Sequence, residues 1–229
     1  MTEFFRFPHT PHIAWLSEGS PRDDKVLAKS EVAQLLGGDV VVEEKVDGAN
    51  LGFAIGESGE VFAQNRRQYL IPPFHGQFSP LGKWLDVHQV RLFDALNESL
   101  IVFGEWCTAR HSLRYDELPG WWLMFDVYDR EAQRFWNTER RNELATNLGV
   151  PLVPQLYRGR VSIGQLTKEV GSANSRFRSG NVEGLVVRKD GALWLEGRAK
   201  LVRPGFTQEI GKHWRSRPLE WNAVIQSND

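Results

Sequence analysis

Lys45 lies in the run 44–48 (EKVDG), where a lysine follows an apolar stretch and precedes an Asp-Gly turn. The valines at 40–42 predict a buried strand, which would place the lysine amine at the end of a rigid element, beside the carboxylate of Asp47. A nucleophilic lysine needs such a fixed position. A surface hairpin is the alternative interpretation, because Asp-Gly turns and exposed lysines are both common.

The composition is that of an ordinary soluble globular protein, with 229 residues, 41% hydrophobic and 25% charged. A formal net charge of −1 excludes a global basic field, so any contact with nucleic acid must be a local patch. The single cysteine, Cys107, excludes an internal disulfide and a multi-cysteine zinc site, and the histidines lack HxH or HxxxH spacing. No apolar run reaches membrane-spanning length and no signal-peptide pattern is present, so a cytoplasmic protein is expected.

Apolar periodicity and turn residues predict an α+β fold rich in antiparallel strands. Helices are expected over 23–36, 82–97 and 138–148, the last with Thr138 as its N-cap. The first residues, 4–15, are interrupted by prolines and predict an extended lead-in. Strands are expected over the ranges 40–45, 51–55, 61–65, 100–106, 121–127, 182–188 and 192–202.

Four later segments complete a pattern that begins at Lys45: FGEW at 103–106, FDV at 125–127, EGLVVR at 183–188 and AKLVR at 199–203. In this order they resemble the signature motifs of the covalent lysyl-nucleotidyltransferases, the superfamily of ATP-dependent ligases and mRNA capping enzymes. Asn50, the Phe-Asp pair and Arg188 resemble the RNA ligase 2 type in particular. The resemblance covers roughly residues 8–206. It implies one ATP-grasp-like ligase adenylation domain over 1–206, built on antiparallel sheets with flanking helices. No OB-fold domain is evident in the sequence.

The resemblance implies a role for each matching residue. Lys45 would attack the α-phosphate of ATP and carry AMP, while Asp47 and Glu183 would hold Mg²⁺ or Mn²⁺. Contacts with ATP would come from Glu105 on the ribose, Phe125 stacked on adenine, Lys200 and Arg188 on the phosphates, and Glu44 and Asn50 beside the nucleotide. Arg66, or equally Arg67, would grip the ribose or an RNA-end phosphate. Lys200 would also serve in catalysis.

The attack requires a neutral lysine amine, whose reference pKa is near 10.4. Reaching neutrality near pH 7 takes about three units, or roughly 4 kcal/mol. We expect burial, neighbouring cations and a bound metal to lower the pKa of Lys45.

Each motif residue also has a structural interpretation. Phe125 alternates with apolar neighbours and suits a core position, and Asp126 suits a turn cap together with Asp129. Glu105 and Glu183 suit solvated strand ends, and Arg66 with Arg67 suits a solvated edge.

Two departures from the family pattern affect the assignment. The last motif usually carries two lysines separated by one residue, but here Val202 follows Lys200 at that spacing. Arg198 or Arg203 would supply the second charge. Related ligases also carry a further domain, whereas residues 207–229 form a short extension that we expect to pack on the domain. Its tryptophans and arginines (Trp214, Arg215, Arg217 and Trp221) suit core packing, or a platform for an RNA end.

The leading hypothesis is a monomeric ATP-dependent RNA ligase that seals 5′-phosphate and 3′-hydroxyl RNA ends, with a nicked duplex as one candidate substrate. A minimal DNA ligase is the second hypothesis. A nucleotide- or RNA-end-binding module without strand joining is the third.

Overall fold

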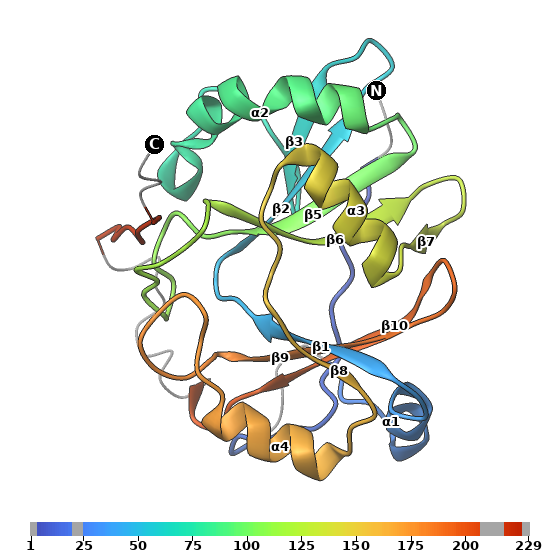
Figure 1. Cartoon of the computed structure of the whole chain (residues 1–229). Coiled ribbons are helices and arrows are strands. Elements are labelled where there is room, and N and C mark those ends of the chain that lie inside the picture. Colours follow the sequence, from blue (N-terminus) through green and yellow to red (C-terminus); the bar gives the residue numbers. More distant parts are fainter. Residues whose placement is uncertain (1–3, 20–24, 207–217, 226–229) are drawn as a thin grey trace.

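The computed structural model describes residues 4–19, 25–206 and 218–225, which form two antiparallel sheets one above the other (Figure 1). The four-stranded sheet has the order β10-β9-β1-β8. Its strands are β1 (Val40–Lys45), β8 (Gln155–Gly159), β9 (Gly184–Asp190) and β10 (Leu195–Val202).

The six-stranded sheet has the order β4-β3-β2-β5-β6-β7. Its strands are β2 (Ala49–Ile55), β3 (Val61–Asn65), β4 (Tyr69–Leu70), β5 (Leu100–Trp106), β6 (Trp122–Asp129) and β7 (Arg134–Phe135). Neither sheet closes into a barrel within the residues that the structure describes.

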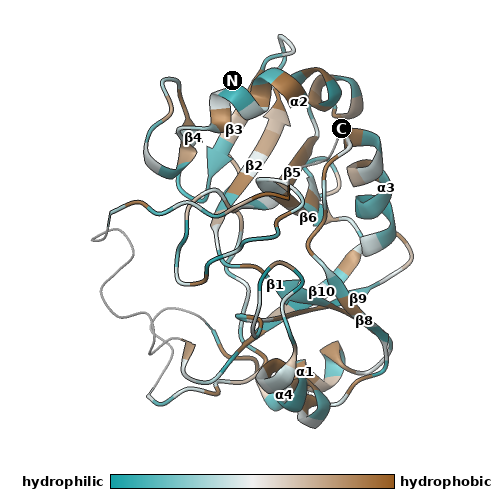
Figure 2. Cartoon of the chain, turned by 60° about the vertical axis from the view of Figure 1, so that its left-hand side comes forward, coloured by the Kyte–Doolittle hydropathy of each residue, from teal (hydrophilic) through white to brown (hydrophobic). Residues whose placement is uncertain are grey.

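Helices cover the outer face of each sheet, and the inner faces of the two sheets lie opposite each other (Figure 1). The six-stranded sheet is covered by α2 (Leu81–Ala95) and α3 (Thr138–Leu148), and a short 3₁₀ turn, Gly76–Phe78, precedes α2. The four-stranded sheet is covered by α1 (Lys29–Leu35) and α4 (Ile163–Ser172). Figure 2 shows the hydrophobic residues of β2 and β5 gathered beneath α2.

Two apolar cores hold these layers. Beneath α2, the ring of Phe53 stacks on Trp84 at 4.9 Å and meets Trp122 edge to face at 5.0 Å. Beneath α4, Val40 and Val42 pack with other buried aliphatic residues of β9 and β10. Burial of aliphatic and aromatic surface at about 25 cal/mol per Å² supplies most of the favourable energy of such layers.

Alternation along β1 decides which side chains reach the space between the sheets. Successive strand residues point to opposite faces, so the face opposite Val40 and Val42 carries Glu43 and Lys45. The chain then leaves this sheet at Lys45 and enters the other at Ala49. Residues 46–48 therefore cross between the sheets at the position of the predicted Asp-Gly turn.

The predicted α+β class, the antiparallel sheets and the predicted strands are confirmed, with shifts of one to three residues at some ends. Two details are wrong. The helix expected over 23–36 begins at Lys29, because residues 25–27 are extended and pair with the backbone of His12; Asp23 and Asp24 lie outside the described residues. The N-cap of α3 is Asn137, whose side chain accepts a hydrogen bond from the Arg140 amide.

Five elements of the described chain were not predicted: the strands β4, β7 and β8, the 3₁₀ turn before α2, and the helix α4. Within the described residues, no helix combines the length and the apolar character needed to cross a bilayer.

Candidate active site

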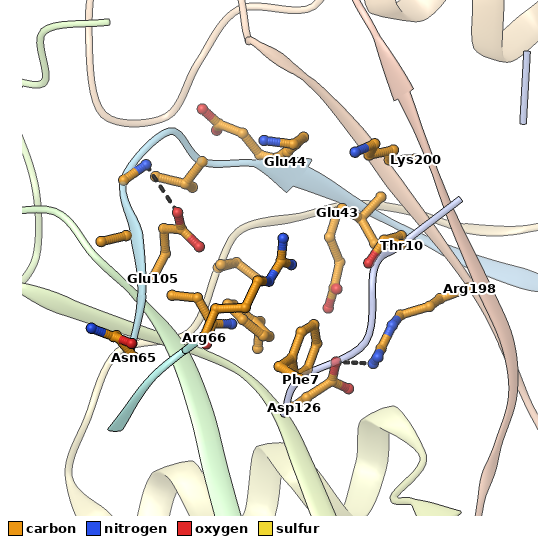
Figure 3. A pocket seen from close by; sticks show the side chains of 18 of the residues that line it. Phe7, Thr10, Glu43, Glu44, Asn65, Arg66, Glu105, Asp126, Arg198 and Lys200 are labelled. Carbon is orange, nitrogen blue, oxygen red and sulfur yellow. Dashed lines mark hydrogen bonds and ion pairs between the residues drawn. The ribbon is translucent and has the colours of Figure 1, made fainter. Parts of the chain in front are cut away.

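A cavity of about 410 Å³ lies between the inner faces of the two sheets (Figure 3). This volume falls in the range of small-molecule and nucleotide sites. Among its lining residues are most of those chosen from the sequence: Glu44, Lys45, Asn50, Arg66, Arg67, Glu105, Phe125, Asp126, Arg188, Arg198 and Lys200. The fold thus brings together residues that are as much as 156 positions apart in the chain.

Lys45 stands at the end of β1 with its amine held by Glu183. Its Nζ donates to Oε1 and Oε2 of Glu183 at 2.6 and 2.7 Å. The Lys45 side chain keeps 26% of its surface exposed, whereas that of Glu183 keeps 6%. The amine is therefore fixed in direction and still accessible from the cavity, as a nucleophile must be.

Carboxylates outnumber cations around this amine. Burial lowers the pKa of Lys45, but the charges of Glu183, Glu105 and Asp47 raise it, and the net shift is upward. Burial thus acts as expected, but the neighbouring charges of the chain act in the opposite direction, and the lowering of this pKa by a bound metal stays a prediction. Because the amine is protonated in this state, any use of Lys45 as a nucleophile requires added positive charge near the carboxylates.

The same crowding acts on the carboxyl groups. Burial, offset in part by Lys45 and reinforced by neighbouring acids, raises the pKa of Glu105 to about 8. Burial likewise raises the pKa of Glu183 to about 7, although Lys45 and Lys200 lower it. Perturbed carboxyl groups in a cavity are typical of functional sites.

Glu105 is positioned by the crossing between the sheets. Its Oε1 accepts a hydrogen bond from the Gly48 amide at 3.0 Å. A Cβ at position 48 would lie 2.6 Å from the Trp106 carbonyl oxygen, so only glycine permits this close approach of two backbones.

Asp47 points to a neighbouring loop. Its Oδ2 accepts from the amides of Ser112 and Leu113 at 2.7 and 2.9 Å, and its own amide donates to the Tyr115 hydroxyl at 2.9 Å. Its charge nevertheless acts on Lys45. Asp47 therefore fixes the turn after the lysine, and its metal role remains a prediction.

Arg66 and Lys200 reach the cavity from the two sheets, and Figure 3 shows Arg66 extending into it from the end of β3. The Nε of Arg66 is buried without a hydrogen-bond partner in the described structure, as is Oδ1 of Asn50, which also lines the cavity. Buried polar atoms are rarely left unpaired, so both point to a polar ligand. Arg67 lines the cavity from a more exposed position.

Asp126, Arg188 and Arg198 form a buried ionic network at one end of the cavity. Asp126 pairs with Arg188 at 2.6 Å and also with Arg198. The Arg198 guanidinium lies between the rings of Phe7 and Phe135, 4.4 and 4.2 Å from their centroids. The turn-cap interpretation of Asp126 is wrong, because its carboxylate is buried in these pairs.

Phe125 is half-buried at this end of the cavity, where its ring meets Phe7 edge to face at 5.4 Å. Its carbonyl oxygen accepts hydrogen bonds from Arg141 at 2.9 Å and from Arg188 at 3.2 Å. Two arginines thus fix the backbone that presents the ring.

Sequence reasoning missed Glu43 and Arg141. Glu43 points into the cavity (Figure 3). Its Oε1 lies 2.7 Å from Nη1 of Arg141. Glu44 also borders the cavity, but its carboxylate turns away and accepts hydrogen bonds from the Ser175 hydroxyl and the Arg176 amide. Period-two alternation from Lys45 would have favoured Glu43 as the inward carboxylate.

The donor set suits a hard divalent cation shared with a ligand. Among the described residues, no group of three or more His, Cys, Asp or Glu side chains is arranged to hold a metal. Mg²⁺ commonly uses one or two carboxylates, several waters and substrate phosphates. The charges of Glu183 and Asp47 near Lys45, with the unpaired Asn50 oxygen, fit such a partial shell.

Arg203 does not line the cavity, and its backbone amide donates to the Glu183 carbonyl. Of the C-terminal extension, the structure describes residues 218–225, which lie against the loop 107–118. The Asn222 side chain bonds there to Tyr115, Cys107 and Ala109. Core packing is wrong for Trp221, which is 46% exposed. Trp214, Arg215 and Arg217 lie outside the described residues.

Known proteins match this chain at two levels. The model of the family described as RNA ligase matches residues 38–202, while among curated protein sequences none matches. The fold is similar to that of Naegleria gruberi RNA ligase with PPi, at a TM-score of 0.61 and 19% identity over 82% of this chain and 55% of that one.

One mutant of the same ligase, with ATP and Mn, has a TM-score of 0.60 and 17% sequence identity over 76% of this chain and 52% of that one. Another mutant, with AMP and Mn, has a TM-score of 0.60 and 15% sequence identity over 89% of this chain and 57% of that one. This chain therefore spans about half the length of those solved ligases.

Proposed function

The chain belongs to the RNA ligase family, and on that premise we propose that it is an ATP-dependent ligase that joins a 5′-phosphate to a 3′-hydroxyl on RNA. The reaction would pass through AMP on Lys45 and then AMP on the RNA 5′-phosphate. The observation that carries this proposal is the Lys45 amine, held by Glu183 at 2.6 Å and open to a nucleotide-sized cavity.

In the first step, Nζ of Lys45 attacks the α-phosphorus of ATP. A P–N bond forms, the bond to the pyrophosphate oxygen breaks, and the amine releases a proton. Lys200 and Arg66 line the cavity from opposite sheets and would face the triphosphate. Such fixed cations stabilise the charge that develops on phosphate oxygens.

The nucleotide's other end would occupy the inner part of the cavity. Phe125 offers a ring face for adenine, because base–aromatic stacking contributes about 1–3 kcal/mol. Glu43 offers a carboxylate that accepts hydrogen bonds, which favours a base with an exocyclic amine. Glu105 and Asn50 face the cavity near the turn after Lys45 and would bind the ribose.

In the second and third steps, RNA takes the place of pyrophosphate. An oxygen of the RNA 5′-phosphate attacks the AMP phosphorus, the P–N bond breaks, and Lys45 is regenerated. A 3′-hydroxyl then attacks the RNA phosphorus, a phosphodiester forms, and AMP leaves. The exposed Arg67 beside Arg66 would bind the RNA end at the edge of the cavity.

We propose that Asp47 and Glu183 bind Mg²⁺ or Mn²⁺ together with ATP. The metal would supply positive charge that neutralises these carboxylates and allows Lys45 to lose its proton.

The direct test is transfer of label from α-³²P-ATP to the protein with Mg²⁺ or Mn²⁺. We expect a covalent adduct that Lys45→Ala abolishes. Lys83→Ala, which removes an exposed lysine on α2, should label like the wild type. An unlabelled wild-type protein, or label that persists in Lys45→Ala, would contradict the proposal.

A joining assay then separates this function from its alternatives. The substrates are nicked duplexes and single strands with RNA or DNA at each end, and with 5′-phosphate or 5′-hydroxyl. Sealing of 5′-phosphate RNA ends supports an RNA ligase, and preference for DNA nicks supports a DNA ligase. ATP or RNA binding without any sealed product supports the third alternative, a nucleotide- or RNA-end-binding module that does not join strands.

A further inference from the structure

The first described residues form a strap, residues 4–13, that runs from one sheet to the other beside the cavity. Figure 1 shows this strap as a dark blue trace descending from the six-stranded to the four-stranded sheet. The sequence predicts an extended lead-in here. The structure gives the segment two anchors and a place in the cavity wall.

The upper anchor is aromatic. The Phe5 ring stacks on Tyr128 at 3.7 Å, and Gln64 Nε2 donates to the Phe5 carbonyl at 2.7 Å. Phe7 is buried against Phe103 and lies 5.4 Å from Phe125. These contacts fix the strap to β3, β5 and β6.

The lower anchor is a pair of backbone hydrogen bonds at the edge of β10. The Lys200 amide donates to the Pro11 carbonyl, and the Ile13 amide donates to the Lys200 carbonyl, both at 2.8 Å. The strap therefore pairs with β10 at the residue whose side chain faces the cavity. The Lys200 backbone is fixed from this side by the strap and from the other by β9.

Thr10 lies between the two anchors and faces the cavity near Glu43 and Lys200 (Figure 3). No described residue forms a hydrogen bond with its hydroxyl. By contrast, Arg198 and Asp126, two other polar residues of the cavity wall, are paired with one another. A hydroxyl that can donate and accept thus stands at the cavity wall, ready for a polar ligand.

We propose that Thr10 is a nucleotide-binding residue, whose hydroxyl forms a hydrogen bond with the ATP bound in this cavity. The strap then acts as a wall of the nucleotide site and holds Lys200 in place for the phosphates. This inference rests on the proposed function, because it takes the cavity's ligand to be ATP.

The test compares Thr10→Val, which keeps the shape and loses the hydroxyl, with Thr10→Ser, which keeps the hydroxyl. One neutral hydrogen bond contributes about 0.5–1.5 kcal/mol, so Thr10→Val should raise the KM for ATP in lysine adenylylation about three- to tenfold. Thr10→Ser should remain within about twofold of wild type. Thr167→Val, on the exposed face of α4, is the matched control and should leave the KM unchanged.

Thermal unfolding separates binding from folding, and all three variants should keep the wild-type Tm within a few degrees. A KM for Thr10→Val equal to that of wild type would overturn the inference while leaving the proposed function intact. If the wild type forms no lysine adduct, ATP titration calorimetry on the same variants decides. Weaker binding in Thr10→Val alone supports the inference, and equal binding, or none in any variant, overturns it.

Discussion

Arg141 on α3 and Glu43 on β1 form an ion pair of 2.7 Å whose side chains are 1% and 2% exposed. The pair joins the helix layer of the six-stranded sheet to β1, an inner strand of the four-stranded sheet. The same guanidinium nitrogen donates to the Phe125 carbonyl at 2.9 Å. Arg141 thus fixes both the Glu43 carboxylate and the backbone that carries the Phe125 ring.

Replacement of Arg141 by methionine should destabilise the protein strongly. Removing one partner of a buried ion pair leaves an uncompensated charge and typically costs about 3–5 kcal/mol. In a chain of this size each kcal/mol corresponds to roughly 2–4 °C, so we expect a fall in Tm of about 10 °C. Thermal unfolding followed by circular dichroism measures it.

The matched variant is the double mutant Glu43→Gln with Arg141→Met. It removes both charges, so its loss of Tm should be clearly smaller than the sum of the two single losses. Additive losses would show that the two residues do not interact in solution.

These two residues mark the limit of what the sequence predicts. Apolar runs and turns locate the strands around Lys45 and Glu105, because strand formation depends on neighbouring residues. The pairing of Glu43 with Arg141 joins positions 98 apart and depends on how α3 packs, which no local pattern encodes. The amphipathic helix α4 was overlooked although Ser162 and Gln165 form a capping box at its start. The edge strand β8 has mostly exposed residues and therefore lacks the apolar alternation that identifies a strand.

Glu105 should make stability depend on pH in the protein without metal or nucleotide. Its pKa in the fold is raised to about 8, chiefly by burial, against an ordinary value of 4.5. Between these values the folded state binds more protons than the unfolded state, so the free energy of unfolding falls as pH rises. A shift of this size corresponds to at most about 5 kcal/mol.

Glu105→Gln should therefore have a shallower dependence of Tm on pH than wild type, measured in EDTA from pH 5 to 9. The two proteins should be similar at pH 5, and the variant should be more stable at pH 8.5. The amide oxygen of the introduced glutamine can still accept a hydrogen bond from the Gly48 amide. Parallel curves would show that Glu105 does not titrate in this window.

Gly48 should not tolerate a side chain. A Cβ would lie 2.6 Å from the Trp106 carbonyl oxygen and 3.0 Å from Cγ of Glu105, so Gly48→Ala must push β2 and β5 apart or displace Glu105. We expect loss of more than about 2 kcal/mol in stability, and at least a tenfold fall in lysine adenylylation. Gly171→Ala is the control, because a Cβ there meets nothing within 4 Å and alanine favours the helix. Equal effects of the two substitutions would contradict the steric argument.

Asp47 offers a test of its structural and metal roles in one residue. Its Oδ2 accepts from two loop amides, at Ser112 and Leu113, while its charge raises the pKa of Lys45. Asp47→Asn keeps an oxygen for the amides and removes the charge, so its Tm should stay within about 3 °C of wild type. Asp47→Ala removes both the acceptor oxygen and the charge, and it leaves the two loop amides without a partner. An unsatisfied buried amide lowers the free energy of unfolding by about 1–3 kcal/mol.

The metal role predicts that Asp47→Asn raises the Mg²⁺ or Mn²⁺ concentration needed for half-maximal lysine adenylylation by at least tenfold. Asp47→Ala should show the same metal dependence and, in addition, the lower Tm. Tyr115→Phe serves as the control, because it removes only the acceptor for the Asp47 amide and should change the Tm but not the metal requirement. An Asp47→Asn protein with wild-type metal dependence would assign Asp47 to the loop alone and leave Glu183 as the metal-binding carboxylate.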